Sequence, residues 1–190
     1  MIALEHGIIR SSEPDDAYAL WQLYDMSSPR SFLIGPSREI YIPTLDELRE
    51  MLGRKDFLSG VFFVVENLQG DIRGCFVMRS AKMESAFAEM MLAMADESDY
   101  GQPLADEVFG FIAYGTFVEK KLNKIQTSCL TTEELYRAFL VRHGFVCDGI
   151  QRDMIYTHGR YYDLESHSLP RSRCQHLEAY KERYSALATS

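Results

Sequence analysis

The run Phe87-Ala-Glu-Met-Met-Leu-Ala-Met94 is apolar, and a polar turn separates it from a helix that begins at Pro103. Proline suits the first turn of a helix, and Asp106 and Glu107 complement the helix dipole. Apolar residues then recur at helical spacing as far as Leu122. A strand, a turn and a helix N-terminus form a natural anion site, because the first amides of the helix lack partners within it. The stretch therefore predicts a helix packed on a sheet, with an anion-binding end.

The turn between this strand and this helix is acidic. It contains Asp96, Glu97 and Asp99, and no Lys or Arg occurs between Met83 and Lys120. Proline at the helix start also has no backbone N–H to offer a phosphate. Backbone amides and the helix dipole are then the groups that would hold an anion here, and the acidic side chains would oppose it.

The bulk composition limits the classes of protein that fit. A chain of 190 residues with 46% hydrophobic content suits one globular domain with a sizeable core. The formal net charge of -8 argues against a nucleic-acid or membrane partner, both of which require a basic face, and suits a cationic partner such as an amine. The N-terminus lacks a signal-peptide pattern, and no apolar run approaches the roughly 18 residues of a membrane span. We expect a soluble, cytoplasmic protein.

The four cysteines predict neither a metal site nor disulfides. Cys75, Cys129, Cys147 and Cys174 show no paired metal-ligand spacing, and Cys174 with His176 is too small a set. We expect four buried free thiols. The five histidines are scattered, and we expect them to be surface or capping residues rather than catalysts.

The first third of the chain reads as a strand and two helices around a long loop. Gly7–Arg10 is a short strand, and Ser12 with Asp15 resembles a capping box before a helix. Thr44 and Glu47 form a second capping box. Between the helices, periodicity is lost from Asp25 to Pro43, although aromatic residues remain, as in functional loops.

The rest of the chain alternates strands with two further helices. Residues 61–66 and 72–79 predict a hairpin, and 85–94 extends it to a meander. Residues 123–129 predict a strand, after which Thr132 caps a helix that stops at Gly144. Residues 149–157 and 161–169 flank a turn at 158–160 and predict a terminal hairpin. Leu177, Tyr180, Tyr184 and Leu187 then mark an amphipathic helix, which would either cover the sheet or pair two subunits in a homodimer.

This order of elements resembles the GNAT family of acyl-CoA-dependent N-acyltransferases. Phrases typical of the branch that acetylates ribosomal-protein N-termini also occur: Leu-Asn-Lys-Ile at 122–125, His-Gly-Phe at 143–145, Asp-Gly at 148–149, Arg152, and Gly-Arg-Tyr-Tyr-Asp at 159–163. The resemblance implies an α+β fold with a mixed central sheet flanked by helices. It implies a GNAT-like domain over residues 1–169 and a C-terminal helical extension over 170–190.

The resemblance also implies where acetyl-CoA, the acyl-donor substrate, would bind. In this family the fourth strand splays from the fifth, and the following loop reads Arg or Gln, two residues, Gly, any residue, then Gly or Ala. Gly101 fits one position, whereas Ser98 and Pro103 occupy the other two, so the pyrophosphate loop is degenerate. The positions expected to contact acetyl-CoA are Met91, Leu92, Ala93, Tyr100, Gly101, Gln102, Leu104, Ala105 and Thr132, the last where the branch commonly has Asn.

Acetyl transfer to an amine needs a base, a polarised carbonyl and an acid for the leaving thiolate. Glu89 on the apolar strand corresponds to a glutamate frequent in the branch and is the expected base, although a solvent-facing strand glutamate is an equal alternative. Backbone amides near Met91–Ala93 would hold the oxyanion. The family's usual tyrosine is replaced by Leu140, so Tyr136, one turn earlier, is the candidate acid, with a core role as its alternative.

The acceptor is expected to lie between the 25–43 loop and the 157–161 turn. Arg30, Arg38 and Arg160 are the charged residues there and suggest an acceptor with a carboxylate or phosphate beside its amine, unless they are ordinary surface arginines. The sequence thus predicts an N-acetyltransferase for a small molecule or a protein N-terminus. The alternatives are a GNAT-like protein that has lost catalysis and binds a ligand or partner, and a purely structural dimerisation protein.

Overall fold

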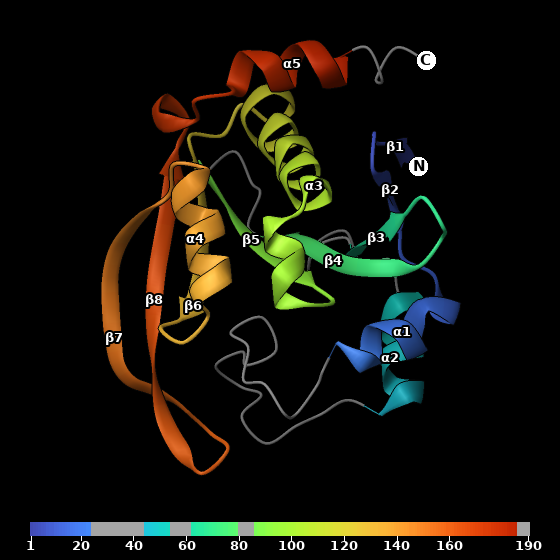
Figure 1. Cartoon of the computed structure of the whole chain (residues 1–190), viewed down its shortest axis with the longest axis vertical. Coiled ribbons are helices and arrows are strands. Elements are labelled where there is room, and N and C mark those ends of the chain that lie inside the picture. Colours follow the sequence, from blue (N-terminus) through green and yellow to red (C-terminus); the bar gives the residue numbers. More distant parts are fainter. Residues whose placement is uncertain (24–43, 54–61, 80–85, 186–190) are drawn as a thin grey trace.

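The computed structural model describes residues 1–23, 44–53, 62–79 and 86–185, and its strands form one eight-stranded sheet in the order β1-β2-β3-β4-β5-β6-β8-β7 (Figure 1). Neighbouring strands are antiparallel except β5 and β6, which are parallel. The mixed sheet flanked by helices is the predicted architecture. The strands are β1 (Ile2–Ala3), β2 (Gly7–Ser11), β3 (Phe62–Asn67), β4 (Ile72–Arg79), β5 (Phe87–Met94), β6 (Lys124–Leu130), β7 (Val146–Thr157) and β8 (Arg160–Pro170).

Helices cover both faces of the sheet. α1 (Ala17–Gln22) and α2 (Leu45–Gly53) lie on one face, and α3 (Pro103–Tyr114) and α4 (Glu134–Arg142) lie on the other (Figure 1). Because side chains alternate along a strand, neighbouring residues of one strand serve the two cores. On β5, Leu92 belongs to the core beneath α3 and α4, and Ala93 belongs to the core beneath α1 and α2.

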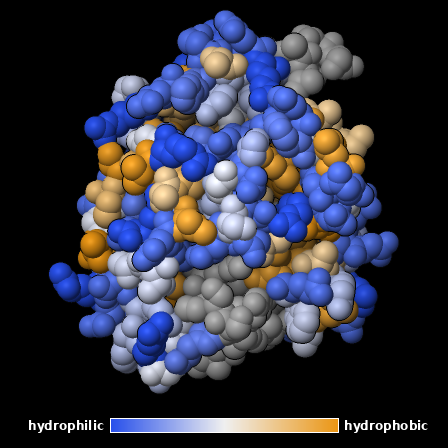
Figure 2. All heavy atoms as spheres, in the orientation of Figure 1, coloured by the Kyte–Doolittle hydropathy of each residue, from blue (hydrophilic) through white to orange (hydrophobic). Residues whose placement is uncertain are grey.

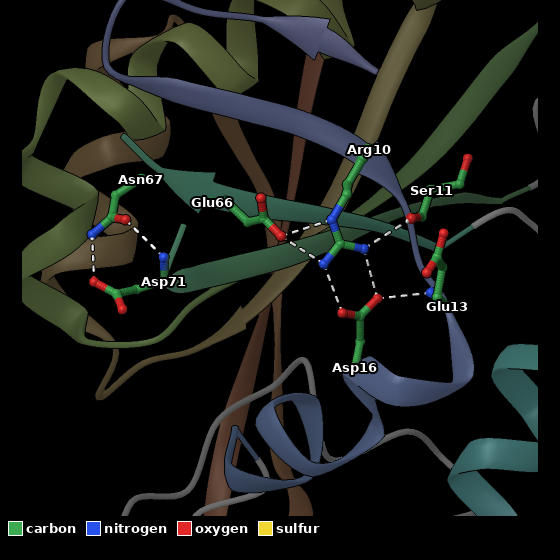
Figure 3. Close-up of polar contacts among 7 residues, drawn as sticks. All are labelled: Arg10, Ser11, Glu13, Asp16, Glu66, Asn67 and Asp71. Atoms are coloured by element: carbon green, nitrogen blue, oxygen red, sulfur yellow. Dashed lines mark hydrogen bonds and ion pairs between the residues drawn. The ribbon is translucent and has the colours of Figure 1, made fainter. Parts of the chain in front are cut away.

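The start of α1 is held to the sheet by Arg10 of β2 (Figure 3). Its two Nη atoms donate to the carboxylate of Asp16 at 2.7 and 2.6 Å, and its Nε donates to Glu66 of β3 at 2.7 Å. Burial alone would raise the pKa of Asp16, but the bonds from Arg10 and from the Glu13 amide lower it. The predicted Ser12–Asp15 capping box is therefore wrong by one residue, because the reciprocal pair is Glu13 and Asp16.

Several predicted boundaries shift. The Thr44–Glu47 capping box is confirmed, with Thr44 N donating to Glu47 Oε2 at 2.8 Å. Glu133, and not Thr132, is the N-cap of α4. Its carboxylate does not cap the helix but accepts from the Leu130 amide, before the helix, at 2.6 Å. The helix that begins at Pro103 remains α-helical only to Tyr114 and continues as a π-helical turn from Gly115 to Glu119.

The C-terminal helix α5 (Leu177–Ser185) packs on α3 and not on the sheet (Figure 1). Tyr184 Oη donates to the carbonyl of Glu107 at 2.8 Å, and the ring of Tyr180 meets that of Phe109 edge to face. A Cβ atom on Gly110 would lie only 2.9 Å from the Tyr180 ring, so glycine permits this close approach. Among the described residues, no helix has the length and apolar character needed to cross a membrane.

Candidate active site

The parallel strands β5 and β6 pair only at their beginnings. Phe87, Ala88 and Glu89 face Lys124, Ile125 and Gln126, and no pair follows among the described residues. β5 nevertheless pairs with β4 as far as Met94, and β6 pairs with β8 as far as Leu130. The two strands therefore diverge toward their C-terminal ends, and we call this region, residues 90–94 and 127–130, the splay. Ligands of sheets with parallel strands commonly bind beyond those ends.

Tyr100 reaches into the splay and bonds the open edge of β5. Its hydroxyl accepts from the Met94 amide at 3.3 Å and donates to the Leu92 carbonyl at 3.0 Å. Residues of an antiparallel pair direct their backbone groups alternately to the two sides of the strand. The Leu92 amide therefore also faces the splay, whereas those of Met91 and Ala93 face β4. Of the three predicted oxyanion donors, the geometry favours Leu92.

Tyr136 of α4 lies against Tyr100, with the ring centroids 4.7 Å apart. It is buried, and its hydroxyl shares a hydrogen bond of 3.0 Å with Thr127 Oγ1 of β6. Burial raises the pKa of Tyr136 well above its ordinary value, so the phenol keeps its proton at neutral pH. The predicted acid thus lies beside the splay, in a core position.

Glu89 lies where the pairing of β5 with β6 ends. It is the last residue of the parallel pairing, opposite Gln126, and it pairs with Arg79 of β4 on its other side. Its side chain is exposed, unlike those of Ala88 and Met90. The predicted base therefore stands at the apex of the splay and in contact with solvent.

The fold brings a positive side chain next to the acidic loop that follows β5, so the charge around the loop is less negative than its own sequence indicates. It forms a 3-10 helix (Glu97–Gly101), in which the Asp96 carboxylate accepts from the Ser98 amide at 2.8 Å. Arg73 of β4 binds both carboxylate oxygens of Asp99 at 2.7 Å, and this bonding raises the pKa of Arg73. The expectation of uncompensated acidic charge is thus corrected, because the fold brings in an arginine from a distant strand.

A second arginine reaches the same loop from α4. Arg142 donates to the Tyr100 carbonyl at 2.8 Å and to Asp106 at 2.6 Å, and His143 Nε2 lies 2.9 Å from the same Asp106 oxygen. Burial lowers the pKa of His143, although Asp106 opposes that effect. Sequence analysis missed Arg142, because an arginine in the last turn of a helix usually serves the helix dipole.

The remaining predicted contacts are dispersed. Gly101, Gln102 and Thr132 are exposed, whereas Leu104 and Ala105 are buried in the first turn of α3. Arg160, the first residue of β8, donates from Nε to Tyr162 Oη at 2.6 Å and stacks on that ring. Arg30 and Arg38 lie outside the described residues.

Comparison with known proteins places these features in a family. The sequence model described as an acetyltransferase (GNAT) domain matches residues 9–165. No curated protein sequence matches the chain.

Solved structures with the same fold include several of the spermidine N-acetyltransferase SpeG from Vibrio cholerae. The complex of that enzyme with CoA and spermine has a TM-score of 0.72 at 20% identity, over 90% of this chain and 98% of the other. A mutant of it has a TM-score of 0.73 at 19% identity, over 90% and 98%. A complex with manganese ions has a TM-score of 0.69 at 23% identity, over 88% and 94%.

Proposed function

Because the chain belongs to the acetyltransferase (GNAT) family, we propose that it transfers the acetyl group of acetyl-CoA to the primary amine of a small molecule or a protein N-terminus. The observation that carries this proposal is the splay, where β5 presents backbone groups that β6 does not pair. An extended chain with amide groups, such as the arm of acetyl-CoA, suits such an edge, as an added strand would. We take residues 1–169 as the acyltransferase domain and 170–190 as its extension.

The proposed chemistry assigns one group to each need. The neutral amine attacks with its nitrogen lone pair, and Glu89 takes a proton from that nitrogen, directly or through water, as the bond to the thioester carbon forms. The Leu92 amide stabilises the oxyanion that develops on the carbonyl oxygen. The carbon–sulfur bond then breaks, and Tyr136, whose ring lies against Tyr100 of the splay, is our candidate to protonate the CoA thiolate, although the pKa that burial raises makes it a weaker acid.

The pyrophosphate of the donor would lie at the loop and the start of α3. The helix dipole favours an anion there, although Pro103 has no amide to donate. Arg142, which is 43% exposed and bonds the Tyr100 carbonyl, adds a positive charge that the sequence pattern did not reveal. These groups support the assignment of Tyr100, Gly101, Gln102, Leu104 and Ala105 to this region.

Two acceptor classes have separate support. The net charge of -8 suits a cationic acceptor, and the solved enzymes of the same fold include one bound to spermine. Arg30, Arg38 and Arg160 instead suit an amine that carries a carboxylate or phosphate. We propose a cytoplasmic protein without nucleic-acid or membrane partners, and a homodimer remains part of the proposal.

One observation favours a second candidate, a GNAT-like protein that binds a ligand without catalysis. Tyr100 already bonds Leu92 and Met94, the groups that an acyl donor would use. A donor must then displace the phenol or bind beside it. A protein that binds CoA but releases no thiol from acetyl-CoA with any amine would belong to this class.

The test combines binding with turnover. Calorimetric titration with acetyl-CoA and with CoA measures donor binding, and a thiol-release assay measures transfer to spermine, spermidine, an amino acid, an aminoalkyl phosphate and a short peptide with a free N-terminus. Transfer to the polyamines alone supports the cationic class, and transfer to the acidic amines supports the arginine assignment. Absence of donor binding at millimolar ligand would overturn the proposed function.

A further inference from the structure

Three buried side chains of β6 and β8 converge beneath α4. Cys129 lies on β6, and Glu165 and His167 lie two residues apart on β8, opposite Cys129 and Thr127. Glu165 Oε2 is 2.8 Å from His167 Nε2 and 4.0 Å from Cys129 Sγ. One ligand atom from each residue lies within 4.8 Å of the other two. The three side chains are 0%, 3% and 3% exposed, so their polar atoms are shielded from bulk water.

The imidazole of His167 is only half satisfied. Its Nδ1 is buried and, among the described residues, has no hydrogen-bond partner. Buried polar atoms normally have partners, so such an atom calls for an explanation. The Glu165 carboxylate accepts from Nε2–H, so in the neutral ring Nδ1 carries a lone pair for which no described group supplies a donor.

A cavity of about 830 Å³ borders Glu165 and His167, two of the three members of this cluster. The α4 residues Glu134, Arg137, Ala138 and Val141 line it, as do Glu165 and His167 of β8. Val141 is 66% exposed at this cavity, and Figure 2 shows apolar side chains at the surface over α4 and β7. A small solute can thus reach the cluster from the side of α4 that faces β7, away from the splay.

We propose that Cys129, Glu165 and His167 form a binding site for a divalent transition-metal ion, with zinc as the best match. Sulfur, imidazole nitrogen and carboxylate oxygen are the three ligand types that zinc takes. Tetrahedral zinc with bonds of about 2.0–2.3 Å separates its ligand atoms by about 3.3–3.7 Å. The observed separations of 2.8 and 4.0 Å lie on either side of that range, so small side-chain rotations suffice.

The protons balance in this binding step. The thiol proton of Cys129 leaves to solvent, and the imidazole proton moves to Nδ1, so that Sγ, Oε2 and Nε2 each present a lone pair to the ion. Three protein ligands leave a fourth position for water. The cavity, which His167 and Glu165 line, has room for that water.

Arg137 is the competitor that the ion must displace. In the described structure its Nε donates to Glu165 Oε2 at 3.0 Å and supplies the opposite charge. Its side chain is 41% exposed and lines the cavity, so it can move toward solvent when an ion arrives. Removal of Arg137 should therefore strengthen metal binding, which a merely adventitious surface site would not show.

Cobalt(II) is the probe, because its bond to a thiolate adds near-ultraviolet absorption that carboxylate or imidazole ligands do not produce. Titration of the whole protein should give this band at one ion per chain, zinc should abolish it by competition, and zinc should raise the melting temperature. Cys129→Ser should remove the band. Arg137→Gln should tighten binding by about tenfold, because Glu165 then has no competing cation.

Cys147→Ser is the matched control, because this thiol is exposed and also lines the cavity. The band should persist in Cys147→Ser. Its loss there and its retention in Cys129→Ser would overturn the assignment, as would absence of the band in the wild-type protein. Should Cys129→Ser fail to fold, His167→Gln provides the second variant, with weaker binding expected and unchanged affinity contradicting the site.

Discussion

At the residue scale, Tyr100 is the group that any ligand of the splay must meet. Its hydroxyl bridges the Leu92 carbonyl and the Met94 amide. A polar side chain that serves the free protein in this way opposes a ligand that needs the same backbone groups.

Tyr100→Phe should therefore have opposite effects on folding and on binding. Loss of the bridge should lower the free energy of unfolding by about 1 kcal/mol and tighten acetyl-CoA binding by about three- to tenfold. Chemical denaturation and calorimetric titration measure the two quantities. Tyr114→Phe, which removes a hydroxyl bonded to Glu119, is the control and should leave acetyl-CoA affinity unchanged. Unchanged affinity in Tyr100→Phe would mean that the donor binds beside the phenol.

Glu89→Gln tests the proposed base. Gln keeps the size and polarity of the side chain, so turnover should fall about 10²–10⁴-fold while acetyl-CoA affinity remains nearly intact. Steady-state kinetics at saturating donor, together with calorimetry, separates the two effects. Glu178→Gln, at an exposed position of α5, should leave the rate unchanged. If Glu89→Gln kept the wild-type turnover, Glu89 would not be the base and would be an ordinary solvent-facing glutamate.

The site residues differ in how far the sequence predicts them. Glu89 could be placed on its strand, because the apolar pattern of residues 87–94 is typical of a strand. The contacts of Arg73 and Arg142 could not be predicted. The two residues approach the acidic loop from β4 and α4, and their positions in the sequence do not indicate that they lie near it. Cys147 was expected to be buried and is exposed, because β7 is the outermost strand of the sheet.

At the element scale, Glu107 joins α3 to both α5 and the first turn of the chain. Its carboxylate accepts from Arg183 at 2.7 Å and from the His6 amide at 3.1 Å. Burial alone would raise the pKa of Glu107, but these bonds outweigh it and lower the pKa below the ordinary 4.5. A carboxylate whose pKa is lowered by folding stabilises the protein at any pH above the pKa that it has in the unfolded chain. This stabilisation is lost as the pH falls through the pKa that the carboxylate has in the folded protein.

Glu107→Gln should therefore destabilise the protein most at neutral pH. The expected loss is about 1.5–3 kcal/mol, the range for hydrogen bonds to a charged group. The difference from wild type should persist down to about pH 4.5 and narrow below it, as melting temperatures between pH 3 and 7 would show. Asp16→Asn, which affects a second carboxylate with a lowered pKa, should act in the same acidic range at an independent site. A gap between Glu107→Gln and wild type that stayed constant with pH would contradict the role of the charge.

Helix ends explain most of the differences between expected and observed elements. The pattern of Ser or Thr before an apolar run indicated approximately where α1, α2 and α4 begin. It did not identify the N-cap residue correctly, since Glu13 and Glu133 occupy the N-cap positions instead of Ser12 and Thr132. Tertiary bonds decide here: Arg10, for example, fixes Asp16 and with it the first turn.

At the scale of the whole molecule, charge offers a test of the acceptor class. The net charge of -8 should attract a polycation and repel anionic acetyl-CoA. We expect kcat/KM for spermine to fall about three- to tenfold between low salt and ~0.3 M salt, because screening acts beyond about 10 Å at 0.1 M salt. A monoamine acceptor should show a smaller fall. Equal slopes for the two amines would contradict long-range attraction of the acceptor.

The fold class could be predicted because local hydrophobic periodicity and turn residues indicate each helix and strand, and the order of these elements is distinctive. The parallel pairing of β5 with β6 follows from the helix that connects them, since such a crossover returns the chain in the same direction. The position of α5 could not be predicted, because an apolar stripe on a helix does not specify which surface of the protein the helix packs against. Gly110 is the structural reason that α5 fits against α3.

The short pairing of β5 with β6 also affects how the two halves of the sheet are held together. Among the described residues, three β5–β6 pairs join, within the sheet, the half that carries α1 and α2 to the half that carries the β7–β8 hairpin. The core beneath α3 and α4 joins the two halves a second time, because it contains Leu92 of β5 together with Ile125 of β6 and Leu169 of β8. Where the two strands diverge, the Tyr100 hydroxyl bonds the backbone of β5, and its ring lies against Tyr136 of α4, which follows β6 in the chain. A ligand that displaces Tyr100 from β5 would therefore disturb a contact that spans the two halves of the sheet.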